Sequence, residues 1–427
     1  MIIIYHPSGN TARLMYIAEH IFGSLSGVAV SITSDIKYFK RHTGAAVNYS
    51  TEPLDHGIWI IPDGLLSETG HHNIGELHVS RWRNLPAPFF SGKGDIPFDI
   101  FAAAFYLLTS YEEYNSPYLD EHGRFDHLVS LAFRYNFLDT PVVDRWALIL
   151  RDILKEKYPS FEYTPRQYRH ISTFDIDHPY LYRYKGVLKN TYGIFRDILA
   201  GDWDKITERL RVIFRIGEDP CFEVIKWIED LFANAGERYI LFALFGKRGK
   251  RGLSTIYPAA EWHRLLPNLI HADTGLHPSY ETYNSIEELY KEKSFMEKVV
   301  RRNIQLLRRH FLRYTCPRSF REALNAGFTD DYTLAFAGAP GFRSGTCVPY
   351  NFYDVERDTV TELRIHPTIV MDTTLKFHLK MTAEEASDEI TRLSDECRAV
   401  GGDFTCLWHN SNLTDSWKNV FIKTLNR

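Results

Sequence analysis

Residues 170–178 read His170-Ile-Ser-Thr-Phe-Asp-Ile-Asp-His178, and this stretch decides the fold. The apolar and β-branched run before the first acid is typical of a strand. Because side chains two residues apart on a strand point to the same face, Asp175 and Asp177 are expected to leave one strand end on one side. One carboxylate can then bind a metal ion while the other accepts a proton. The alternative is a solvated turn, which acidic residues also favour.

The C-terminal part of the chain, residues 166–427, alternates strand and helix patterns over about 260 residues, the usual size of a barrel of alternating strands and helices. Strands are expected at residues 170–174, 239–244, 274–277, 332–335, 368–370 and 405–408. The main helices are expected at residues 221–234, 285–311 and 383–400. The predicted fold class is therefore α/β.

The N-terminal part shows the same alternation on a smaller scale. Strands are expected at residues 2–5, 28–32 and 57–62, and helices at residues 11–22, 99–114 and 141–155. The segment from Tyr158 to Pro165 has two prolines and no helical period, and is the expected linker. The predicted domains are residues 1–160, a small α/β domain without a catalytic signature, and residues 166–427.

Length and composition limit the class of protein. The chain has 427 residues, too long for one ordinary core, and 44% of them are hydrophobic. Its net charge of −4 with mixed signs predicts no nucleic-acid partner. Five scattered cysteines without a CxxC pair predict reduced thiols and a cytoplasmic protein. No segment approaches the roughly 18 apolar residues of a membrane span, and the N-terminus does not resemble a signal peptide.

Several predicted strand ends carry a distinctive polar residue. These residues are His277, Arg343 in a glycine-rich loop, Asp372 and His409, and Pro349-Tyr350 follows the arginine. Functional residues of (β/α) barrels gather at the carboxyl ends of several strands. Each one alone has a structural explanation, such as a surface ion pair for the arginine. The set and its order indicate a shared site.

Residues 166–427 resemble the polysaccharide deacetylase family, also called the NodB-homology family or carbohydrate esterase family 4. The resemblance is carried by Thr173-Phe-Asp-Ile-Asp177, Gly275-Leu-His277, Arg343 with Pro349-Tyr350, and Leu407-Trp-His409. It implies a distorted, incomplete (β/α) barrel of about seven strands. It also implies a hydrolase of non-peptide carbon–nitrogen bonds that removes N- or O-acetyl groups from a sugar or polysaccharide with one divalent metal ion.

The resemblance implies Asp177 and His277 as metal ligands. Four residues after His277, where the family has a second histidine, this chain has Glu281. Catalytic zinc usually takes three protein ligands, so Glu281 is the expected third ligand, with His178 and His271 as alternatives. The expected metal is zinc, with manganese, cobalt or nickel as alternatives because a carboxylate-rich set suits harder ions. A catalytically silent carbohydrate-binding barrel without metal remains the main alternative.

The resemblance also implies that Asp175 is the catalytic base and His409 the general acid, tuned by Asp372. We expect Arg343 near Asp175, where a cation favours the ionised carboxylate. The backbone N–H of Tyr350, after Pro349, is expected to meet the oxyanion. A glycoside hydrolase is a second alternative, because Asp175 and Asp372 could flank a glycosidic bond. The glycoside hydrolase alternative leaves Arg343 and His409 without roles.

The N-terminal region resembles the uncharacterised α/β domain that precedes some bacterial deacetylase-like barrels, through residues 111–114, 123–125 and 141–146. Arg124 and His127 are expected to make surface pairs at the domain interface, with the barrel cleft as the alternative. His310 and Arg313 are expected at the end of the 285–311 helix, where cations complement the helix dipole. A basic rim that holds an anionic sugar is the alternative for these two residues.

Overall fold

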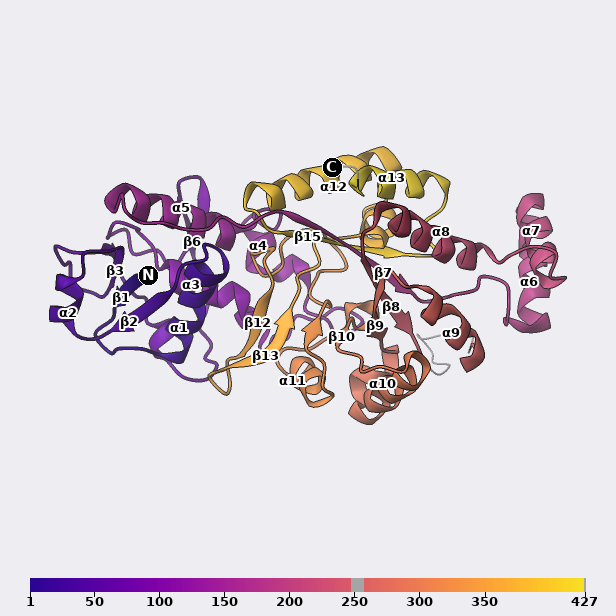
Figure 1. Cartoon of the computed structure of the whole chain (residues 1–427), viewed down its shortest axis with the longest axis horizontal. Coiled ribbons are helices and arrows are strands. Elements are labelled where there is room, and N and C mark those ends of the chain that lie inside the picture. The colour runs from indigo at the N-terminus through magenta and orange to yellow at the C-terminus, as the bar shows by residue number, and fades with distance from the viewer. Residues whose placement is uncertain (247–256, 426–427) are drawn as a thin grey trace.

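A computed structural model describes residues 1–246 and 257–425 of the chain. The described residues form two mainly parallel sheets with helices packed around them (Figure 1). The N-terminal region lies at one end of an elongated molecule, and the C-terminal helices lie along its middle (Figure 1). The expected mixed α/β class is confirmed.

The smaller sheet belongs to the N-terminal region and has four parallel strands in the order β2–β1–β3–β4. They are β1 (Ile2–Tyr5), β2 (Val30–Thr33), β3 (Ala46–Tyr49) and β4 (Ile58–Ile60). The helices of this region are α1 (Ala12–Ala18), α2 (Ile36–Arg41), α3 (Ile100–Leu108), α4 (Leu131–Arg134) and α5 (Val142–Lys157), and a hairpin pairs β5 (Val79–Trp82) with β6 (Leu85–Pro88). Helix α3 is apolar and buried along its whole length, and the Asp99 carboxylate caps its first turn.

The larger sheet has nine strands in the order β12–β13–β11–β10–β9–β8–β7–β15–β14, and every neighbouring pair is parallel except β12 with β13. The strands are β7 (Arg169–Ile176), β8 (Tyr239–Leu244), β9 (Ala272–His277), β10 (Leu306–Leu307), β11 (Asp330–Asp331), β12 (Tyr350–Asp354), β13 (Thr359–Ile365), β14 (Val370–Met371) and β15 (Asp403–His409). The apolar runs of the central strands β7, β8 and β15 are buried on both faces, as a parallel sheet requires.

Helices connect the strands of this sheet. They are α6 (Gly186–Leu199), α7 (Trp203–Ile213), α8 (Pro220–Ala235), α9 (Ala259–Leu265), α10 (Ile286–Val300), α11 (Arg318–Asn325), α12 (Ala383–Ala399) and α13 (Asp415–Leu425). Helix α8 starts with Asp219 as its cap and Pro220 in its first turn, and Thr382 and Glu385 form a capping box on α12. Helices α6 and α7 project from the end of the molecule opposite the N-terminal sheet (Figure 1).

The expected helix over residues 285–311 is wrong in its second half. Helix α10 ends at Val300, and Arg301 takes a left-handed backbone conformation with φ 55°, which stops a helix. The chain then enters β10 and a single 3-10 turn, η7 (His310–Leu312). His310 and Arg313 are therefore not at the end of a helix. They follow the carboxyl end of a strand.

The expected strand over residues 332–335 is displaced, because the paired strand is β11, just before it. The residues after β11 stay hydrogen-bonded on both sides: the Tyr332 N–H donates to the Leu307 carbonyl at 2.8 Å, and the Thr368 N–H donates to the Leu334 carbonyl at 3.0 Å. The hairpin of β12 and β13 at one edge of the sheet was not expected. The other edge strand is β14.

The two halves of the chain share one continuous apolar core. Polar contacts also cross between them. Buried Asp144 of α5 accepts a hydrogen bond from the Cys347 N–H at 2.9 Å, and the Tyr16 hydroxyl donates to the Asn351 carbonyl at 2.8 Å. Among the described residues, no helix combines the length and the apolarity that crossing a bilayer needs.

Candidate functional site

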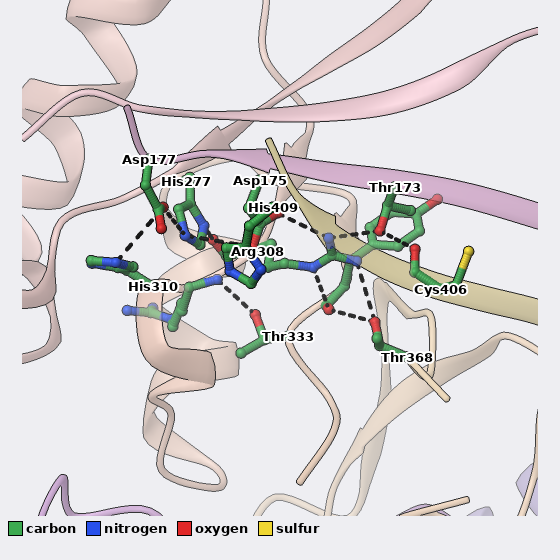
Figure 2. A network of polar contacts seen from close by, with 12 residues as sticks. Thr173, Asp175, Asp177, His277, Arg308, His310, Thr333, Thr368, Cys406 and His409 are labelled. Carbon is green, nitrogen blue, oxygen red and sulfur yellow. Dashed lines mark hydrogen bonds and ion pairs between the residues drawn. The ribbon is translucent and has the colours of Figure 1, made fainter. Parts of the chain in front are cut away.

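Four polar side chains meet at the carboxyl ends of the central strands (Figure 2). Asp175 lies near the end of β7 and Asp177 directly follows that strand, His277 ends β9, and His409 ends β15. The parallel register of β7 and β15 sets His409 directly opposite Asp175. These four are among the residues for which a common location was expected, and strand periodicity together with register brings them together.

Asp177, His277 and His310 form a group that could hold a metal ion, with one ligand atom from each lying within 4.8 Å of the others. The Asp177 Oδ1 lies 3.4 Å from the His277 Nε2 and 3.8 Å from the His310 Nε2. Glu281, the expected third ligand, is not part of this group. It lies in the 3-10 segment η6 (Tyr280–Asn284), and it does not line the pocket described below.

The donor atoms of this group fit a metal ion. Asp177 Oδ1 and His277 Nε2 are buried, and neither has a hydrogen-bond partner. The His277 Nδ1 lies 2.6 Å from the Arg308 carbonyl, which can only accept, so Nδ1 carries the proton and Nε2 presents its lone pair to the group. One carboxylate and two imidazoles make up a ligand set common in catalytic zinc sites.

The charge states of the group also suit a metal ion. Burial lowers the pKa of His310 to about 3, so this imidazole is neutral at neutral pH. Burial acts to raise the pKa of Asp177, but His310, His277 and His409 outweigh it and hold that pKa well below its usual range. Burial acts to lower the pKa of His277, and Asp175 and Asp177 reverse the effect. A proton and a metal ion therefore compete for the Nε2 of His277.

Arg308, and not Arg343, is the cation beside Asp175. The Arg308 side chain is fully buried, and its Nη1 donates to the Asp175 Oδ1 at 3.0 Å and to the Thr173 hydroxyl at 2.7 Å (Figure 2). The backbone carbonyl of the same residue fixes His277. Arg308 thus orients the expected base through its side chain and a metal-ligand candidate through its backbone.

The expected position of Arg343 beside Asp175 is wrong. Its guanidinium forms a two-point ion pair with Glu113 of the N-terminal region, at 2.9 and 2.8 Å, and lies over the rings of Tyr314 and Phe336. Buried Glu113 requires a cation, and the bidentate fork of arginine supplies one.

Pro349 and Tyr350 also lie away from the four polar side chains. Tyr350 begins the edge strand β12, where it pairs with Ile365 and packs against His20 of the N-terminal region. Neither Pro349 nor Tyr350 lines the pocket at the strand ends. The residues between Arg343 and Tyr350 lead the chain out to the interface between the two halves, where Asp144 binds the Cys347 N–H.

His409 and Asp372 form a tight pair. The Nδ1 of His409 donates to the Asp372 Oδ1 at 2.6 Å, and the His409 backbone N–H donates to the Asp372 Oδ2 at 2.8 Å. Burial acts to lower the pKa of His409, but the Asp372 carboxylate, helped by Asp177 and Asp175, raises it to about 10. The imidazole is therefore protonated at neutral pH.

A pocket of about 470 Å³ opens over these side chains. Asp175, Asp177, His277, His310 and His409 line its polar wall. Its apolar lining includes Phe311, Leu312, Met371, Phe377 and Leu407. Arg124 and His122 of the N-terminal region also line it, so both halves of the chain build this pocket.

The contribution of the N-terminal region comes from a small hairpin, residues 119–125, in which Leu119 pairs with Phe125. Arg124 forms an ion pair with Asp120 at 2.7 Å and also donates to the Phe311 carbonyl at 2.6 Å. Both expectations for Arg124 therefore apply, because it makes a pair at the interface and lines the cleft. His127 does not line this pocket.

This hairpin packs on the turn that carries His310. The His122 ring contacts Phe311 with centroids 4.9 Å apart, and the His122 carbonyl accepts from the Arg313 Nε at 2.6 Å. Phe311 and Leu312 both have left-handed backbones, with φ 61° and 51°. Such conformations are costly for non-glycine residues and persist where neighbours impose them. The N-terminal region thus helps to impose the turn that aims His310.

Arg308 and His310 were missed as site residues because the sequence Arg308-Arg-His310 was assigned to a helix end. A usable signal was present. Ile304, Leu306 and Leu307, with Gln305 among them, form a short strand-like segment just before it, and polar residues after such segments mark strand ends elsewhere in this chain.

Comparisons with known proteins give a family match and a structural similarity. Residues 2–159 match a family of unknown function, DUF7033. The crystal structure of a presumed polysaccharide deacetylase from Mycobacterium smegmatis is similar with a TM-score of 0.38 and 12% sequence identity, over 61% of this chain and 83% of that chain. Comparison with curated proteins gives no sequence match.

Proposed function

We propose that this protein is a metal-dependent hydrolase that removes acetyl groups from a sugar or polysaccharide. One observation carries the proposal: a buried carboxylate, a three-residue group suited to a metal ion and a protonated histidine all face one pocket. These are the three functions that hydrolysis of an acyl group requires, namely a base, an electrophile and a general acid. The motif resemblance of residues 166–427 agrees with this assignment.

The residues take the following roles. Asp177, His277 and His310 would hold a divalent ion, which would lower the pKa of a water molecule and polarise an acyl carbonyl. Asp175 accepts the proton of the attacking water, and the fixed charge of Arg308 holds its carboxylate in place. Two imidazoles and one carboxylate favour zinc over the harder ions that Glu281 would have favoured.

His409 donates a proton to the leaving sugar nitrogen or oxygen. Its Nδ1 is held by Asp372, so its Nε2 is the atom free to donate. With a pKa of about 10 it carries the proton through the neutral range. Its place opposite Asp175 in the strand register sets base and acid on neighbouring strands above one pocket.

Asp372 is poorly suited to the glycoside hydrolase alternative. That mechanism needs a second carboxylate that reaches the substrate. Both oxygens of Asp372 are bound, to the ring and backbone of His409 and to the Thr373 N–H, and the side chain is buried. Asp372 also does not line the pocket. Its role is to position and charge His409.

We also propose that the larger sheet curls into the distorted barrel that the resemblance implies. Strands β10 and β14 are far apart in the order of the sheet, yet Leu312 and Met371, which follow and end them, line the same pocket and pack in one apolar cluster. The Tyr332 N–H donates to Leu307 of β10, and the Thr368 N–H, just before β14, donates to Leu334. The residues after β11 therefore link β10 to the chain that enters β14.

The first test is acetate release. The purified full-length protein, supplied with zinc, is expected to release acetate from at least one N- or O-acetylated sugar oligomer. A chelator should stop the release, and added zinc, manganese, cobalt or nickel should restore it, since the ion supplies the electrophile. Protein that retains no metal and releases no acetate from either class of sugar would support the silent binding barrel.

The Asp372→Asn variant tests the origin of the His409 charge. Without the carboxylate, the effect of burial dominates and the pKa of His409 falls far below about 10. His409 then loses its proton at a lower pH than in the wild type. We expect the alkaline limb of the kcat/KM profile to move to lower pH, with activity at neutral pH reduced about 100-fold or more.

The matched control for this variant is Asp330→Asn. It removes a similar carboxylate, which lies 2.7 Å from the His366 ring and outside the pocket. Its pH profile should match that of the wild type. An unchanged alkaline limb in Asp372→Asn would contradict the general-acid role of His409.

A further inference from the structure

Residues 183–216, which contain helices α6 and α7 and are called here the projecting helix pair, expose an unusual amount of apolar surface. Of the twenty-seven large hydrophobic side chains exposed among the described residues, twelve lie between residues 184 and 216. Val187 and Leu188 are 82% and 87% exposed, and Tyr192, Phe195 and Trp203 are also exposed. An apolar surface of this extent marks an interaction site.

The interior of the projecting helix pair combines a buried ion pair with the apolar residues Ile206 and Val212. Asp197 of α6 and Arg209 of α7 form an ion pair at 2.6 Å and are both almost fully buried. Gly193 lies against this guanidinium so closely that a Cβ would meet it at 2.4 Å, and the Tyr182 ring packs on it with 4.5 Å to the centroid. Two charged side chains thus pair inside, while most of the large apolar side chains of the pair face outward. This arrangement suits apolar surroundings more than water.

The exposed apolar residues form a stripe along each helix, and polar Thr207 interrupts the stripe of α7. On α6, Leu188, Tyr192, Phe195 and Leu199 follow the spacing of one helix face, and on α7 Trp203, Leu210 and Phe214 do the same. Both helices stand clear of the body of the molecule (Figure 1). The stripes are therefore open to a large, flat partner.

The charge of the projecting helix pair identifies the partner. Residues 183–216 contain eight Lys and Arg but four Asp and Glu, a net charge of +4 in a chain whose total is −4. A hollow of about 610 Å³ on the pair has a cationic lining that consists of Lys185, Lys189, Arg196, Lys205 and Arg209. Leu188 and Tyr192 line the same hollow, so cationic and apolar groups alternate around it.

We propose that the projecting helix pair docks the protein on the surface of an anionic lipid bilayer. Exposed aromatic and aliphatic side chains insert at the boundary between headgroups and acyl chains, and the cations bind lipid phosphates. A second copy of this chain is a poorer occupant, because two faces of net charge +4 repel each other. This inference is independent of the proposed hydrolase activity.

Vesicle sedimentation tests the proposal with the full-length protein. The wild type is expected to sediment with vesicles of phosphatidylcholine and phosphatidylglycerol, to stay in solution with phosphatidylcholine alone, and to dissociate as salt is raised. The triple variant Leu188→Ser, Phe195→Ser, Trp203→Ser should bind the anionic vesicles at least about tenfold more weakly than the wild type. The double variant Lys185→Glu, Lys189→Glu, which reverses two cations of the hollow, should weaken binding by a similar factor.

Control variants place changes of the same kind elsewhere on the surface. Ile270→Ser with Val360→Ser removes exposed apolar groups outside the pair, and Arg301→Glu with Arg302→Glu reverses the same number of charges, and both should bind as the wild type does. Circular dichroism should show equal folding of all variants. Wild-type binding by the two test variants would overturn the proposal. So would a wild-type dimer, seen by analytical ultracentrifugation without lipid, that the triple variant converts to monomer.

Discussion

Substitution of His310 by alanine is expected to abolish retention of the metal ion and, with it, acetate release. His310 supplies one of only two imidazoles in the group formed with Asp177 and His277, and two remaining ligands hold a catalytic ion poorly. We expect metal affinity to fall roughly 100-fold or more. Elemental analysis after desalting and titration of the apoprotein with zinc measure this change.

Glu281→Ala is the matched control for His310→Ala, because the two variants separate the ligand set expected from sequence from the one in the structure. Glu281 lies outside the Asp177, His277 and His310 group, so its removal should leave zinc affinity unchanged. Loss of zinc in Glu281→Ala with retention in His310→Ala would show that the ligand set in the structure is wrong. Loss in both variants would mean that the ion takes four protein ligands.

Substitution of Asp175 by asparagine is expected to remove turnover while the protein stays folded and loaded with metal. Asparagine can still accept the hydrogen bond from the Arg308 Nη1, but it cannot take a proton from water. General base catalysis contributes about 10²- to 10⁴-fold, and we expect kcat/KM to fall by that factor. Zinc titration should give nearly the wild-type affinity, because the three ligand atoms remain.

Asp331→Asn controls for the loss of a buried carboxylate. Asp331 is also fully buried at a strand end of the same sheet, where it accepts from the Thr333 N–H at 2.7 Å, and it does not line the pocket. Its acetate release should stay close to the wild-type rate. If folded, zinc-loaded Asp175→Asn releases acetate nearly as fast as the wild type, Asp175 is not the base.

The N-terminal region has a structural reason to stay attached to the rest of the chain. Its hairpin of residues 119–125 lines the pocket and packs on the turn after β10, and Glu113 pairs with Arg343. An arginine expected to serve the reaction instead serves the contact between the two halves. Tyr350 also packs at this contact, against His20. Arg343 and Tyr350 therefore both lie away from the strand ends.

The sequence by itself determined the local features. Alternating side-chain direction in β7 sets Asp175 and Asp177 on one face, and apolar runs followed by a histidine mark the ends of β9 and β15. These features depend on neighbours within a few residues, so their pattern is readable from the chain. The α/β class follows from the same periodicities.

Only the tertiary structure decided which distant residues complete the site. Arg308 rather than Arg343 meets Asp175, and His310 rather than Glu281 joins Asp177 and His277, because the order of strands in the sheet sets β10 beside β9. The short strand β10 has two residues and too little pattern to be recognised alone. Its neighbours, and the hairpin that imposes the turn after it, are separated from it by long stretches of chain, and such contacts leave no local periodicity.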